Sequence, residues 1–78
     1  MDLPDDLIAL ERAAEEQRAK LDGLDGAEYE AQLRAWREAS AAALAAIADH
    51  AAANGQSRYD VEMAVKLAVR HAEDDPAG

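Results

Sequence analysis

The stretch Glu28–Ala53, EYEAQLRAWREASAAALAAIADHAAA, constrains the fold more than any other part of the chain. It is rich in alanine, which has the highest helix propensity of all the amino acids. Turn sequences that contain glycine bound it at both ends. The stretch therefore predicts one long helix over about 26–53, which at 1.5 Å per residue spans roughly 42 Å.

The segment before it, about 3–21, predicts another helix. Pro4 suits the first turn of a helix, where a missing N–H costs nothing. The apolar residues from here into the turn alternate spacings of four and three, which is typical of a helix that packs lengthwise on another, as in a coiled coil. They are Leu3, Leu7, Leu10, Ala14, Leu21 and Leu24, with Gln17 as a polar interruption. The short turn 22–26 predicts an antiparallel helical hairpin, and Asp25 followed by Glu28 resembles a capping box.

The segment after the second glycine-containing turn predicts a third helix over about 58–72. Ser57 is placed to cap it, because a serine hydroxyl can accept a hydrogen bond from the first turn of a helix. Apolar side chains cover an arc of about 200°, wider than the stripe that a surface helix needs. The segment 74–78 contains proline and predicts a flexible acidic tail. We therefore expect a single all-α domain over 1–73.

The predicted core is thin. Alanine supplies 21 of the 78 residues and buries little area, and a domain of this size retains only about 3–5 kcal/mol of net stability. The predicted lengths let the outer helices overlap on the long helix only around 39–45. Apolar surface is then left without a partner in the chain, so we expect a two-fold symmetric homodimer. The candidate interaction surface comprises Ile8, Ala35, Ala42, Ala46, Tyr59, Met63 and Leu67.

Acidic side chains dominate the charge, which is −9 overall. Residues 1–30 carry ten acidic and three basic side chains, giving −7, whereas residues 54–78 carry five and three, giving −2. Nucleic acids and anionic lipids attract basic surfaces, so this balance argues against both as partners. No window approaches the ~20 apolar residues of a membrane span, and no secretory signal is visible. The expectation is a cytoplasmic protein that does not associate with membranes.

Only two histidines are present, and no cysteine. His50 and His71 come close if the third helix folds back. With Asp49 and Glu73 beside them, they could then act as ligands of a metal ion. The spacing matches no common ligand pattern, because His-x₃-His and Glu-x-x-His are both missing. Surface histidines near the carboxyl ends of helices explain them better, since a cation is favoured there.

Other reactive side chains have simpler structural explanations. The glutamates of the first helix are expected on its solvated face. Trp36 and Tyr29, at helical spacing, are expected in the core. Neither serine has the histidine and aspartate neighbours of a catalytic nucleophile. We therefore expect no catalytic, cofactor-binding or metal-binding residues, and no enzymatic activity.

Three stretches resemble small uncharacterised helical proteins of high-GC actinobacteria such as Streptomyces. They are LPDDLIALERAAEEQRAKL at 3–21, YEAQLRAWREA at 29–39 and GQSRYDVEMAVKLAVRHA at 55–72. Six arginines against two lysines and the abundant alanine agree with such a genome. This resemblance implies no assigned function, activity or binding residue.

The sequence thus favours a non-enzymatic helical protein–protein interaction module that forms a homodimer. An alternative is a regulatory accessory protein that binds DNA through Arg58, Lys66 and Arg70, which the pattern places on the outward arc of the third helix. In another form of that alternative, the acidic N-terminal half imitates DNA. A metal protein that uses the two histidines ranks third.

Overall fold

Three helices account for the fold. The structure is a computed structural model that describes residues 2–74, with side chains described through His71. Within this range lie α1 (Asp5–Ala19), α2 (Gly26–Ala53) and α3 (Arg58–Asp74), and no strand. The all-α prediction and the long central helix are confirmed. The helix α3 continues through Asp74, two residues past the predicted end, and the remainder of the predicted tail, 75–78, lies outside the described residues.

The helix α1 begins two residues later and ends two residues earlier than the predicted range of about 3–21. Pro4 is not inside the helix but immediately before it, with an extended backbone (ψ 142°), and its carbonyl accepts a hydrogen bond from the N–H of Leu7 at 3.1 Å. The turn that follows contains Gly23 at φ +82°, a conformation that costs glycine no steric strain. Asp25 precedes α2, but its side chain makes no capping hydrogen bond, so the predicted capping box is not formed.

The second turn is held by hydrogen bonds at both of its ends. The N–H of Gln56 donates to the carbonyl of Ala51 at 2.8 Å, and that of Gly55 donates to Ala52 at 3.4 Å. These bonds, with Gly55 at φ +62°, form the Schellman motif that commonly ends a helix. The hydroxyl of Ser57 accepts a hydrogen bond from the N–H of Asp60 at 3.4 Å, which confirms the predicted cap of α3.

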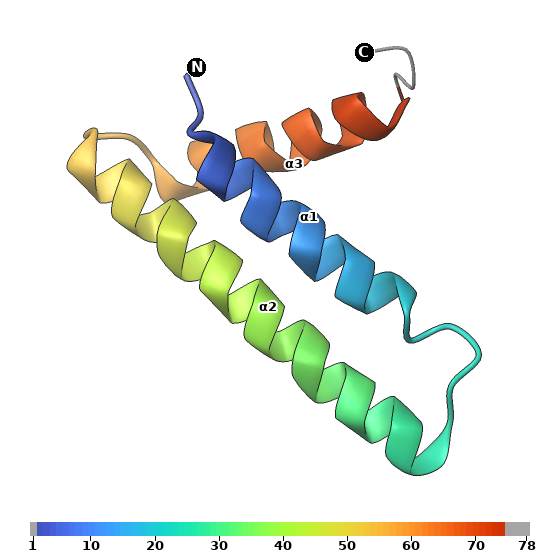
Figure 1. The fold of residues 1–78 in the computed structure, drawn as a ribbon. Helices are drawn as coiled ribbons and strands as arrows, with labels where there is room; N and C mark the ends of the chain where they lie inside the picture. Colours follow the sequence, from blue (N-terminus) through green and yellow to red (C-terminus); the bar gives the residue numbers. More distant parts are fainter. Residues whose placement is uncertain (1, 75–78) are drawn as a thin grey trace.

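The helices α1 and α2 form the predicted antiparallel hairpin (Figure 1). Its register is marked by Gln17, the polar interruption of the apolar pattern. The side-chain amide of Gln32 donates to both the backbone carbonyl and the side-chain oxygen of Gln17, at 2.7 and 2.9 Å. A polar residue in the helix interface therefore has a partner across it, which removes the cost of burying it alone.

The core lies at the end of the hairpin opposite its turn, where α3 crosses the N-terminal part of α1 (Figure 1). Its members are Leu7, Ile47, Ala51, Val61 and Val65, with Leu3 and Ala46 packed partly against it. All the buried residues of α2 lie between Ala43 and Ala51, so the three helices meet further along α2 than predicted. Tyr29 is 39% exposed, and Trp36 is only partly buried and lies outside the core, so the prediction that both belong to the core is wrong.

Ile47 lies in this core and is 1% exposed, so we expect substitutions of it to lower the stability of the fold. The substitution Ile47→Val removes one buried methylene group and should lower the free energy of unfolding by about 1 kcal/mol, or roughly 4–8 °C in Tm. Ala41→Gln, on the exposed side of the same helix, should change it by less than about 0.5 kcal/mol. Thermal denaturation followed by circular dichroism at one protein concentration measures both. Equal effects would contradict this location of the core.

Candidate functional site

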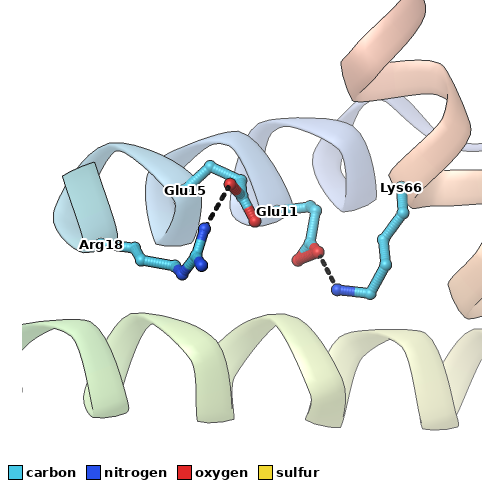
Figure 2. Close-up of polar contacts among 4 residues, drawn as sticks. All are labelled: Glu11, Glu15, Arg18 and Lys66. Carbon is cyan, nitrogen blue, oxygen red and sulfur yellow. Dashed lines mark hydrogen bonds and ion pairs between the residues drawn. The ribbon is translucent and has the colours of Figure 1, made fainter.

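A buried glutamate links α1 to α3. Glu11 is 6% exposed, and its Oε1 accepts a hydrogen bond from Nζ of Lys66 at 2.5 Å (Figure 2). The glutamates of the first helix were expected on a solvated face, and for Glu11 that prediction is wrong, because α3 crosses α1 at this turn. The pattern placed Lys66 on the outward arc of the third helix. In the structure its ammonium group is paired with Glu11, although 47% of its side chain remains exposed.

The ion pair stabilises the charged form of the lysine. The hydrogen bond that Lys66 donates to Glu11 raises the pKa of Lys66, and the charges of Glu11, Glu62 and Glu15 raise it further, while burial acts in the opposite direction. A carboxylate buried without such a partner would be costly. The pair therefore fixes where α3 lies on α1.

The hairpin groove is the second feature. Two hollows, which share Glu15 and Arg18, run from the crossing of α3 along the hairpin towards its turn. We call the residues of α1, α2 and the turn between them that line these hollows the hairpin groove: Glu11, Ala14, Glu15, Arg18, Ala19, Leu21, Asp22, Tyr29, Trp36, Ser40 and Leu44. Glu62 and Lys66 of α3 close one end of it. Its two large exposed side chains, Tyr29 and Leu44, are 39% and 41% exposed.

The third feature is a row of exposed apolar side chains on α3. Tyr59, Met63 and Leu67 follow one another at intervals of four residues and are 67%, 48% and 65% exposed. We call these three residues the outer row. They lie on the side of α3 away from the buried Val61 and Val65.

The remaining residues of the predicted interaction surface differ in exposure. Ala42 is exposed, whereas Ile8 and Ala35 are half-buried. Ala46 packs partly against the core of its own chain, because it lies where the three helices meet. The structure thus brings together only the α3 members of the predicted surface as one row.

Sequence reasoning missed the hairpin groove and the buried ion pair. Position 11 lies four residues after Leu7 and three before Ala14, which places it next to the apolar pattern of α1. That spacing was a usable signal, but a glutamate there was assigned to solvent by residue type.

The histidines form no recognisable metal site. Among the side chains that the structure describes, no group of three or more histidine, cysteine, aspartate or glutamate residues is arranged to hold a metal ion. His50 is instead next to Asn54, whose side-chain amide donates to the backbone carbonyl of His50 at 2.8 Å and lies 3.3 Å from Nδ1. His71 is exposed on α3.

Comparison with protein-family models, with curated proteins and with solved structures finds no match to this chain. The actinobacterial resemblance of its three sequence stretches therefore stays a prediction. In the described part of the chain, no helix has the length and apolar character needed to cross a bilayer.

The ion pair predicts an asymmetric response to mutation. Lys66→Met leaves the Glu11 carboxylate buried without its cation, and should lower the free energy of unfolding by about 1–3 kcal/mol. The cost stays below that of a fully buried pair, because water reaches the half-exposed lysine site. Adding Glu11→Leu should restore part of the loss, since no buried charge remains. Urea denaturation measures both variants, with the exposed Lys20→Met as control; a double variant less stable than Lys66→Met would contradict this account.

The raised pKa of Lys66 also predicts a dependence on pH. A lysine whose pKa is higher in the folded state contributes stability below its ordinary pKa of 10.5 and loses that contribution as pH rises through the higher value. The difference in unfolding free energy between the wild type and Lys66→Met should therefore be constant near neutral pH and shrink above about pH 10.5. Using the difference cancels the titration of the two tyrosines, which both proteins contain. A difference that grows at high pH would contradict the assignment.

Proposed function

We propose that this chain is a small, non-enzymatic helical protein–protein interaction module that pairs with a second copy of itself. The observation that carries the proposal is the outer row of α3, where three large apolar side chains lie in contiguous turns with about half or more of their surface exposed. Contiguous apolar surface of this kind typically marks a site of contact with another molecule.

The extended shape of the chain supports the same proposal. Its radius of gyration, 13.9 Å, exceeds the ~11.5 Å expected for a compact domain of this length. An extended chain of this size exposes more surface to a possible partner than a compact one does.

The proposal predicts a dimer in solution. Multi-angle light scattering at tens of micromolar should give twice the 8.3 kDa mass of one chain. Met63→Glu places a charge in the outer row and should return the mass to that of a single chain, because burying an unpaired carboxylate is unfavourable. The matched control Ala45→Glu changes an exposed residue of α2 that belongs to neither the predicted interaction surface nor the hairpin groove, and it should leave the dimer intact. A wild-type mass of one chain would refute the proposal.

A further inference from the structure

The second turn, 54–57, joins α2 to α3 and contains the only asparagine of the chain, Asn54, directly before Gly55. In an asparagine–glycine pair the backbone nitrogen of the glycine can attack the side-chain amide carbon, because the glycine has no Cβ to obstruct the approach. Both residues are exposed, and a Cβ added to Gly55 would meet nothing within 4 Å. The rest of the fold therefore leaves space for this reaction.

The closed turn holds the two reacting groups apart. Asn54 has ψ 9°, which turns the nitrogen of Gly55 towards the backbone nitrogen of Asn54 and away from its side chain. The side-chain amide of Asn54 donates a hydrogen bond to the carbonyl of His50 at 2.8 Å, which keeps it at the end of α2. The attack thus requires a rotation about the Cα–C bond of Asn54. The hydrogen bonds that Gly55 and Gln56 donate to carbonyls of α2 oppose this rotation.

Opening this turn disturbs few contacts. The N–H of Gly55 makes a long bond to the carbonyl of Ala52, 3.4 Å, and both residues are exposed to solvent. Exposed turns open locally at a much smaller cost in free energy than the core, which opens only when the whole domain unfolds. Folded molecules therefore reach the reactive conformation from time to time.

We infer that Asn54 is a site of spontaneous deamidation, and that this modification weakens the junction between α2 and α3. In the opened turn the nitrogen of Gly55 forms a bond to Cγ of Asn54. The Cγ–Nδ2 bond breaks, and ammonia leaves with the proton that the nitrogen of Gly55 has given up through solvent. A water molecule then adds to a carbonyl of the five-membered succinimide ring and opens it to aspartate or isoaspartate. Solvent water is the only co-reactant, and nothing is oxidised or reduced.

Either product removes the hydrogen bond that caps α2. An ionised carboxylate has no hydrogen to donate, so the bond to the carbonyl of His50 is lost. A negative charge is also unfavourable at the carboxyl end of a helix. Isoaspartate in addition inserts one methylene group into the main chain between α2 and α3. This end of α2 contains Ala51, which is 3% exposed and belongs to the core, so the change reaches the packing of α3.

Incubation of the folded wild-type chain at mildly alkaline pH tests the modification. Its intact mass should rise with time by about 1 Da, the difference between an amide and an acid. Cleavage after arginine should locate the gain in the fragment 38–58, at Asn54. The matched control Asn54→Gln keeps an amide that can reach the same carbonyl, but its longer side chain would have to close a six-membered ring. Its mass should stay constant over the same period.

Two further measurements test the opened turn and the effect of the product. In guanidinium chloride, which abolishes the hydrogen bonds of the turn, the rate of the mass gain should rise at least about tenfold. Ion exchange separates the modified fraction, because it carries one more negative charge. Circular dichroism should show that this fraction, like the variant Asn54→Asp, melts roughly 4–8 °C below the wild type.

The outcomes decide each part of the inference. A folded chain that keeps its mass while the denatured chain reacts would overturn it, as would an equal gain in Asn54→Gln. Equal rates with and without guanidinium chloride would overturn the role of turn opening, and a modified fraction that melts with the wild type would overturn the weakened junction. The oligomeric state decides none of these results, because Asn54 belongs to neither the outer row nor the hairpin groove.

Discussion

The difference in helix length governs this structure. The helix α2 has 28 residues, whereas α1 has 15 and α3 has 17, so no neighbour covers it fully. The three helices meet at only one end, and the buried side chains of α2 gather there. The rest of the hairpin is two helices thick at most, and such a layer leaves part of every side chain in contact with water. The partial burial of Trp36 follows from this arrangement and not from any local feature of its sequence.

The Glu11–Lys66 pair fits this arrangement because it lies at the crossing of α1 and α3. Valine side chains provide the area that holds α3 to the hairpin, but apolar packing alone tolerates small rotations of one helix on another. A buried carboxylate is less tolerant, since losing its cation costs more than a shifted methyl group. The pair thus makes one orientation of α3 more favourable than its neighbours. That orientation is also the one that leaves the outer row exposed.

Features of the fold that depend on neighbouring residues could be predicted from the sequence. Features that depend on contacts between residues far apart in the sequence could not. The bounds of α2 and the cap at Ser57 depend on helix propensity and on turn residues, which act within a few positions. The pairing of the two halves of the hairpin follows from a regular apolar pattern. The burial of Glu11 and the exposure of Tyr29 depend instead on where α3 crosses, which is decided by residues more than 50 positions from Glu11. For the candidate site, the outer row was predictable because it lies on one helix, whereas the groove requires two helices and their register.

The proposed dimer would change how the stability of this chain is understood. A three-helix core built from five small or medium apolar residues leaves little net stability for one copy alone. A partner that binds only the folded state adds stability by mass action, in an amount that rises with protein concentration. Because α3 carries core residues on one side and the outer row on the other, forming the core and presenting the interface are the same event. Folding and association would therefore be coupled through this one helix.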